Sequence, residues 1–258
     1  MKQILASVVS VNTIAQDIFE MKLYAPELFE GQAVRPGMFV HMLLGDDARI
    51  LRRPISIYGA NPQDGQIALA IQIVGQGTRK LSEKKPGDRV DILGPLGNNF
   101  EFQDARIIYG VGGGVGISPI RFAAMSLNPG QEMEAFFGYR TQSLIYGDEG
   151  LECPVHITTD DGSAGEHGLV TAPLKRRMAE RRPDLVICCG PTPMMRAVQK
   201  LCSEMEIECQ LSLEARMGCG VGACNGCTVK VKDGADWQYR RVCVDGPVFQ
   251  GKDVIFNG

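Results

Sequence analysis

The chain has 258 residues, about 1.7 times the usual domain length of roughly 150, which predicts one large domain or two to three small ones. Its residues are 44% hydrophobic and 22% charged, a composition that excludes disordered and collagen-like proteins. The net charge of −3 gives no electrostatic reason to expect a nucleic acid or an anionic membrane as the main partner.

Nine cysteines are present, and no apolar run reaches the ~18 residues that a membrane-spanning helix needs. Residues 1–10 carry one lysine and a short apolar run, which is too weak a pattern for a signal peptide. We therefore expect a cytoplasmic protein that does not bind membranes. In that reducing compartment, cysteines serve metal binding or core packing rather than disulfides.

Short strands separated by turn residues are predicted for the first hundred residues. Within 17–24, Phe19, Met21 and Leu23 alternate with residues that are mostly polar, which is the period of a strand. One short helix is expected near 78–85. Six closely spaced strands predict a small antiparallel barrel, at residues 3–11, 17–24, 38–44, 55–60, 67–74 and 89–93.

The pattern changes at Arg106 to strands that alternate with glycine-rich loops and helices, which predicts a parallel α/β sheet. The expected strands are 106–110, 132–138, 154–159, 185–189 and 208–213, and the expected helices are 117–127, 170–181 and 193–205. Residues 214–258 hold four cysteines and many glycines but show little helical periodicity. A segment this short cannot build its own core, so we expect a metal to hold it together.

The strongest motif lies in this last segment, where Cys219, Cys224, Cys227 and Cys243 follow a C-x4-C-x2-C-x15-C spacing. This is the plant-type spacing of a [2Fe–2S] cluster. A loop that wraps a cluster needs residues that tolerate positive φ and close approach to sulfur, and the candidates are Gly218, Gly220, Gly222 and Gly226. The alternative is a zinc site, which normally presents two separate C-x2–4-C pairs. The other five cysteines are expected to be buried.

Two loops of the α/β region are typical of nucleotide binding. The strand 107–111 leads into a turn containing Gly112, Gly113, Gly114 and Gly116, where a pyrophosphate could approach backbone N–H groups at a helix start. A later strand ends at Cys189-Gly190-Pro191, on the carboxyl edge where α/β sheets bind ligands. Each loop could instead be a plain strand-to-helix turn.

Two segments of the barrel region suggest phosphate binding, although each is weak evidence by itself. Arg52-Arg53-Pro54-Ile55-Ser56 places guanidinium groups beside a hydroxyl, and a guanidinium donates two parallel hydrogen bonds to phosphate. Val74-Gly75-Gln76-Gly77-Thr78 ends a strand and begins a helix. The sequence contains no HExxH, G-x-S-x-G or P-loop motif, so hydrolase and NTPase interpretations fail, and the three histidines are expected to be structural or surface residues.

In this order, the motifs resemble the ferredoxin-reductase-like flavoproteins, over residues 5–256. The strings 214–227 and 241–249 are specifically similar to the family of electron transfer subunits of NAD-dependent dihydroorotate dehydrogenase. The chain departs from the wider superfamily at Ile55, where a tyrosine commonly lies against the flavin. The resemblance implies FAD on Arg53, Pro54, Ile55, Ser56, Ala70, Ile71, Gln72, Gly77 and Thr78, NAD on Gly112, Gly113, Gly114, Gly116, Cys189, Gly190 and Pro191, and the cluster on the four cysteines.

The resemblance further implies an FAD-binding barrel domain at 1–102, an NAD-binding α/β domain at 103–212 and a [2Fe–2S] domain at 213–258. Electrons would pass from the FMN of a catalytic subunit through the cluster and FAD to NAD+, in the pathway that makes UMP. The partner would oxidise dihydroorotate, because this chain shows no separate substrate pocket with a base. Two copies of each subunit would form a heterotetramer.

Three alternatives stay open at this point. The chain could serve a related reductase of the sulfide dehydrogenase or ferredoxin:NADP+ type, which shares the flavin and nucleotide domains. It could instead be a non-enzymatic redox sensor or zinc module on the same scaffold. The choice between NAD and NADP is also open, because Arg140 could meet either a ribose or a 2′-phosphate.

Overall fold

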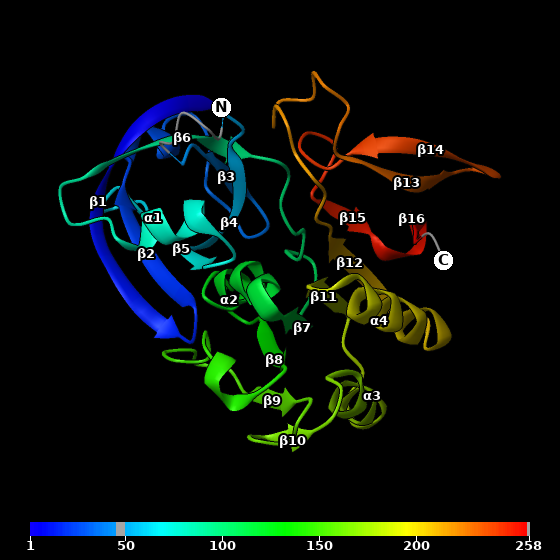
Figure 1. Cartoon of the computed structure of the whole chain (residues 1–258). Coiled ribbons are helices and arrows are strands. Elements are labelled where there is room, and N and C mark those ends of the chain that lie inside the picture. The colour runs from blue at the N-terminus through cyan, green and yellow to red at the C-terminus, as the bar shows by residue number, and fades with distance from the viewer. Residues whose placement is uncertain (45–49, 257–258) are drawn as a thin grey trace.

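The computed structural model describes residues 1–44 and 50–256, which form a closed barrel and two further sheets. Figure 1 shows the barrel beside the central sheet, with the C-terminal segment packed against both. Within the described residues, none of the helices has the length and apolarity needed to cross a membrane.

The barrel confirms the predicted six antiparallel strands, which close in the order β1-β2-β5-β4-β3-β6. Phe19, Met21 and Leu23 are buried, so the alternation in the sequence does identify the inner face of β2. The strands are β1 (Lys2–Ala15), β2 (Ile18–Tyr24), β3 (Phe39–Met42), β4 (Arg53–Asn61), β5 (Gln66–Gln72) and β6 (Arg89–Leu96), and a 3-10 turn, η1 (Pro26–Phe29), follows β2.

The short helix of the barrel region, α1, spans Gln76–Ser82 rather than the predicted 78–85. It ends early because Lys85 begins a turn, in which Asp88 N–H donates to the Lys85 carbonyl at 3.0 Å and Asp88 Oδ2 accepts from Lys85 N–H at 2.9 Å. The local turn competes for backbone groups that a longer helix would use.

The central sheet has the strand order β10-β9-β8-β7-β11-β12-β15. All its pairs are parallel, as predicted, except that β15 runs antiparallel to β12. The strands are β7 (Ile107–Gly113), β8 (Glu132–Tyr139), β9 (Val155–Thr159), β10 (Glu166–His167), β11 (Leu185–Cys189), β12 (Glu208–Ser212) and β15 (Val248–Gln250).

Helices cover both faces of this sheet (Figure 1). Helix α2 (Ile117–Ala124), preceded by the turn η2 (Gly114–Gly116), lies between the sheet and the barrel. Helices α3 (Thr171–Glu180) and α4 (Thr192–Glu204) pack on the opposite face, where they share a core with β7, β8 and β11. A further turn, η3 (Gln142–Leu144), follows β8.

The C-terminal segment forms a three-stranded sheet in the order β14-β13-β16. Its strands are β13 (Thr228–Asp233), β14 (Asp236–Arg241) and β16 (Val254–Ile255), with the turn η4 (Gly251–Asp253) before β16. Cys227, Val231 and Val242 belong to the same apolar core as Tyr109 and Val186 of the central sheet. The segment therefore has no separate core, in agreement with its small size, and it contributes β15 to the central sheet.

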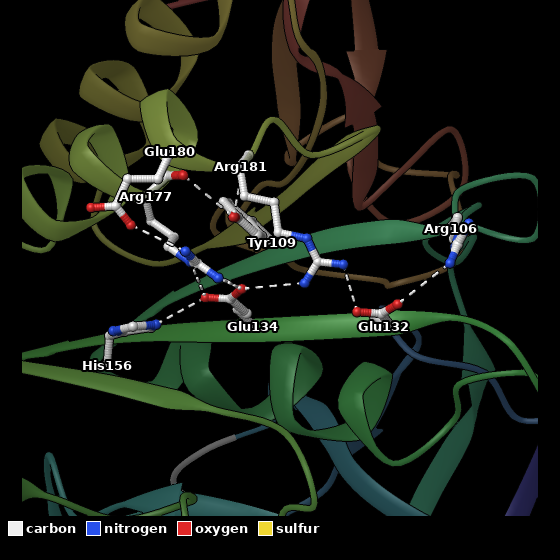
Figure 2. Close-up of polar contacts among 8 residues, drawn as sticks. All are labelled: Arg106, Tyr109, Glu132, Glu134, His156, Arg177, Glu180 and Arg181. Atoms are coloured by element: carbon white, nitrogen blue, oxygen red, sulfur yellow. Dashed lines mark hydrogen bonds and ion pairs between the residues drawn. The ribbon is translucent and has the colours of Figure 1, made fainter.

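A network of charged side chains joins α3 to β8 (Figure 2). Glu134 is buried (6% exposed) and accepts two 2.9 Å hydrogen bonds from Arg177, while His156 Nε2 lies 3.1 Å from Glu134 Oε2. Arg181 pairs with Glu132 on the same strand at 2.6 Å. Burial alone would raise the pKa of Glu134, but hydrogen bonds from Arg177 and His156 outweigh it and the pKa is lowered.

We expect Glu134→Gln to lower the free energy of unfolding by about 1–3 kcal/mol at pH 7, because it leaves the Arg177 guanidinium without its buried carboxylate. A carboxylate whose pKa is depressed by folding stabilises the protein above its unfolded pKa, so the difference should shrink as pH falls below about 4. Urea unfolding at several pH values measures it. Glu132→Gln, in a more exposed pair, should lower stability less than Glu134→Gln does. Equal stability of Glu134→Gln and wild type at pH 7 would contradict the account.

Candidate functional site

A cavity of about 630 Å³ opens at the carboxyl edge of the central sheet. Strands β7 and β11 are adjacent and parallel, with Gly112 paired to Cys189, so the two glycine loops that follow them meet at one point. Five of the residues predicted for NAD line the cavity, namely Gly113, Gly114, Gly116, Gly190 and Pro191. Gly112 and Cys189 lie directly behind them, at the ends of their strands.

The two loops touch so closely that glycine is required at their contact. A Cβ on Gly116 would overlap the carbonyl of Cys189, which is backbone and cannot rotate away. Gly190 has a φ of +155°, and a Cβ there would come within 3.0 Å of Gly113 backbone. These contacts hold the start of α2 against the end of β11, which is the close helix–strand packing that a dinucleotide loop needs.

Ionisable side chains complete the cavity and its surroundings, and sequence reasoning did not select two of them, Glu214 and Asp160. Glu214 lines it and is exposed to it, while desolvation by the surrounding protein raises the pKa of its carboxyl. Burial also raises the pKa of the Cys189 thiol, so this sulfur is protonated at neutral pH. Arg140 and Asp160, after β8 and β9, line the cavity with opposite charges. Only their places at strand ends could have indicated them in the sequence.

The barrel forms one wall of the same cavity through Ile18 and Gln72. Gln72 is the last residue of β5 and was predicted for FAD. The neighbouring residues predicted with it differ in placement, because the Ile71 side chain lies in the barrel core and Ala70 is buried against the α2 side. Neither residue lines the cavity, and their role in FAD binding stays a prediction.

The predicted flavin strand β4 lies next to β3, and the pairing defines its faces. Ile55 pairs with Val40 and packs against the barrel core, whereas Pro54 and Ser56 lie opposite His41 and Phe39. Arg53 Nη1 donates to the Leu51 carbonyl at 2.8 Å. The adjacent Arg52 instead pairs with Asp91 at 2.9 Å.

Gly77 and Thr78 of α1 lie on the barrel and are not part of the cavity lining. The Thr78 hydroxyl accepts from Val74 N–H at 3.0 Å and donates to the Gly75 carbonyl at 3.2 Å. A Cβ on Gly77 would overlap Leu44. Both residues therefore shape the start of α1, and their contact with a phosphate stays a prediction.

The four motif cysteines are arranged as two pairs. Cys219 and Cys224 lie in side-chain contact, and so do Cys227 and Cys243. Among the described residues, no three His, Cys, Asp or Glu side chains converge on a single metal position. A [2Fe–2S] cluster takes two thiolates on each of two irons, so the two-by-two arrangement fits this group.

The backbone of the loop prepares one of these sulfurs for a metal. Val221 N–H and Cys224 N–H each donate to Cys219 Sγ at 3.4 Å. The first of these bonds is the main cause that lowers the pKa of the Cys219 thiol to about 6. Burial, in contrast, raises the pKa of Cys243 to about 12. A metal would have to displace that proton when it binds.

The loop glycines have two different roles. Gly220 and Gly222 have φ values of +72° and +81°, so they supply the left-handed backbone that was predicted. Gly218 and Gly226 instead lie against the sulfur of Cys224, where built Cβ atoms would be 3.4 and 3.5 Å away. Sequence reasoning missed the third left-handed position of the loop, Asn225, whose φ is +51°.

An ion pair outside the motif braces the loop. Arg241 Nη1 donates to the Gly222 carbonyl at 3.1 Å, and its Nε lies 3.2 Å from Asp245 Oδ2. The same carboxylate oxygen accepts from Arg241 N–H at 2.7 Å. These bonds tie the segment that carries Cys243 to the segment that carries the other three cysteines.

Two segments of the chain match known families, an "Oxidoreductase FAD-binding domain" at residues 5–102 and the "Iron-sulfur cluster binding domain of dihydroorotate dehydrogenase B" at residues 214–255. The dihydroorotate dehydrogenase B (NAD(+)) electron transfer subunit of Caldanaerobacter subterraneus is 37% identical over 252 residues, covering 97% of this chain and 98% of that protein. The chain belongs to this family of electron transfer subunits. The subunit of Geobacillus kaustophilus is also 37% identical, over 96% of this chain and 97% of its own length.

Solved structures agree with this family membership and with the fold. The structure of an NADH-dependent reduced ferredoxin-NADP oxidoreductase, described in connection with flavin-based electron bifurcation, has a TM-score of 0.85 and 31% identity over 98% of this chain and 90% of its own. The CS-b5R domains of human Ncb5or superpose with a TM-score of 0.67 at 19% identity, over 80% of this chain and 67% of that one, which shows a shared fold. The predicted resemblance and the barrel plus α/β architecture are thereby confirmed.

The contact between the two glycine loops gives a testable expectation. Gly116→Ala should force β11 and α2 apart, lowering the melting temperature and weakening NADH binding at least tenfold, because the added methyl meets fixed backbone. Gly114→Ala is a matched comparison, since nothing lies within 4 Å of its Cβ and only its φ of +55° opposes alanine. Thermal unfolding and NADH titration of both variants measure this, and a smaller effect at Gly116 than at Gly114 would contradict it.

Proposed function

We propose that this chain is the electron transfer subunit of an NAD+-dependent dihydroorotate dehydrogenase in the synthesis of UMP. In this role it takes electrons from a catalytic subunit and delivers them to NAD+. The observation that carries the proposal is the conjunction, in one chain, of two cysteine pairs, a barrel that matches an FAD-binding family and a cavity at the two glycine loops of the central sheet. The names of the full-length relatives support the same function.

The proposal assigns one redox group to each of the three parts of the chain. We propose FAD on residues 1–102, NAD on 103–212 and the cluster on 213–258, each on the residues predicted above. When bound, the cluster carries single electrons, NAD+ accepts hydride, and FAD can exchange electrons with both. The two-by-two arrangement of the cysteines provides the ligands that two irons need.

The chain's own residues position these groups and control charge. Loop N–H groups at the start of α2 bind a pyrophosphate, and the contact of Gly116 with Cys189 keeps that loop at the sheet edge. The protonated Cys189 thiol adds no negative charge beside the cavity. Tyr139 and Tyr146 are likewise neutral, because burial raises the pKa of both hydroxyls.

The proposal includes a catalytic partner that binds FMN and oxidises dihydroorotate, in an assembly of two copies of each subunit. The cavity beside the two glycine loops is assigned to NAD in this proposal, and the oxidation of dihydroorotate is assigned to the partner. We propose the cytoplasm as the compartment, because each of the nine cysteines is free and five lie outside the cluster motif.

The alternative, a ferredoxin:NADP+-type reductase subunit, is not favoured, because the full-length relatives are named as electron transfer subunits of dihydroorotate dehydrogenase B. The two functions differ in the electron donor and in the nucleotide. Reduction of NAD+ by dihydroorotate, measured with an FMN-containing catalytic subunit added to this chain, supports the first function. Reduction of NADP+ by ferredoxin without such a subunit would replace it by the second.

Removing one cluster ligand should separate the two halves of the electron route. Cys224→Ser is expected to lose its iron, and electron transfer between this chain and the partner should slow at least tenfold. NADH should still reduce FAD at a rate close to wild type. Iron and sulfide assays, anaerobic NADH bleaching of the flavin spectrum and the coupled dihydroorotate assay measure this. Cys153→Ser is the matched control, because Cys153 is a partly exposed cysteine outside the motif. Loss of flavin reduction alone would contradict the proposed order.

A further inference from the structure

Strand β3 carries a histidine for which the proposed electron route has no role so far. His41 is completely buried, with 0% exposure, and among residues 1–44 and 50–256 neither ring nitrogen makes a hydrogen bond of ordinary geometry, although the backbones of Arg52 and Cys219 lie close to the ring. A buried polar atom without a partner costs roughly 1–3 kcal/mol, so such atoms are rare in folded proteins. The ring therefore calls for a partner that binds in this place.

The position of His41 connects the flavin strand with the cluster loop. On the barrel side, His41 pairs with Pro54 of β4, and Arg52 Nη1 donates to the His41 carbonyl at 3.3 Å. On the other side, the ring lies against Gly220 and beside the backbone of Cys219, the first cluster ligand. One side chain thus lies between the strand predicted for FAD and the loop predicted for the cluster.

The close contact between His41 and the loop requires glycine at position 220. A Cβ at position 220 would overlap Nδ1 of His41, and the φ of +72° also requires glycine there. The loop backbone therefore lies directly on the imidazole. Because Cys219, the first predicted cluster ligand, immediately precedes Gly220, the ring lies against the part of the loop that carries this ligand.

Packing alone does not account for a histidine here. Phe39, two residues earlier on the same face of β3, is apolar, 3% exposed and part of the core shared with Cys227 and Cys243. An apolar ring is thus accommodated on this face without unpaired nitrogens. The cost of burying the ring nitrogens of His41 must be offset by a polar partner, which an apolar ring could not bind.

We propose that His41 is a positioning residue that directs a ring N–H toward the cluster and thereby raises the cluster's reduction potential. The inference rests on the proposed function, since it needs a bound [2Fe–2S] cluster. One-electron reduction adds one negative charge, and an N–H dipole that points at this charge stabilises the reduced form. Imidazole keeps at least one N–H in each protonation state found in proteins, so the effect needs no titration of the ring.

The test compares the full chain, reconstituted anaerobically with FAD and cluster, as wild type, His41→Phe, His41→Gln and His156→Phe. Iron and sulfide content, the electron paramagnetic resonance spectrum of the dithionite-reduced cluster and its midpoint potential are measured. We expect His41→Phe to keep its iron. The equilibrium constant for one-electron reduction of its cluster should fall about tenfold, which lowers the midpoint potential by about 59 mV. His41→Gln, which retains N–H donors, should shift less, and His156→Phe should match wild type.

An unchanged potential in iron-loaded His41→Phe would overturn the inference and leave the proposed function intact, as would an equal shift in His156→Phe. A wild-type chain that binds no iron would overturn the proposed function itself. Should His41→Phe fail to hold the cluster, His41→Met replaces it, because methionine adapts to irregular space and has no N–H. Cluster loss from both apolar variants but not from His41→Gln supports the inference, and loss from all three overturns it.

Discussion

The pairing of β15 with β12 is the constraint on which the arrangement of the three sites depends. It adds a strand from the C-terminal segment to the edge of the central sheet, so the loop that carries the cysteines is fixed to the sheet that carries the two glycine loops. Asn98 extends the same constraint to the barrel, because its side chain donates to the Val248 carbonyl and accepts from Val248 N–H, each at 2.8 Å. Backbone ladders and paired amides hold their geometry more tightly than exposed side-chain contacts do.

Redox groups held at fixed separations need surroundings that do not gain or lose charge in an uncontrolled way. Around the nucleotide cavity, burial raises the pKa of Cys189, Tyr139 and Tyr146, so these groups stay neutral. Around the cluster loop the opposite holds for Cys219, where backbone N–H groups favour the thiolate that a metal requires. Cys219 thus differs from the buried thiol and phenols near the cavity, because its surroundings favour the charged form of the side chain.

The network around Glu134 has a different role from either site. It lies at the far end of β8 from the cavity, and it fixes α3 to the sheet through a buried carboxylate and two arginines (Figure 2). Because α3 and α4 share one core with β7 and β11, stability gained there supports the strand ends that carry both glycine loops. The site residues themselves make few such bonds, as is common for residues kept available for ligands.

The sequence alone determined the features that depend on local chemistry, namely the strand period, the helix positions, the glycine turns and the spacing of four cysteines. It could not show that Gly116 touches Cys189, that β15 crosses into the central sheet or that His41 lies under Gly220. Each of these contacts joins residues from distant parts of the chain, and a single sequence records no such pairing. The cysteine spacing was readable because four thiolates on two irons constrain one short loop, whereas His41 carries no motif and gains its meaning from burial in the tertiary structure.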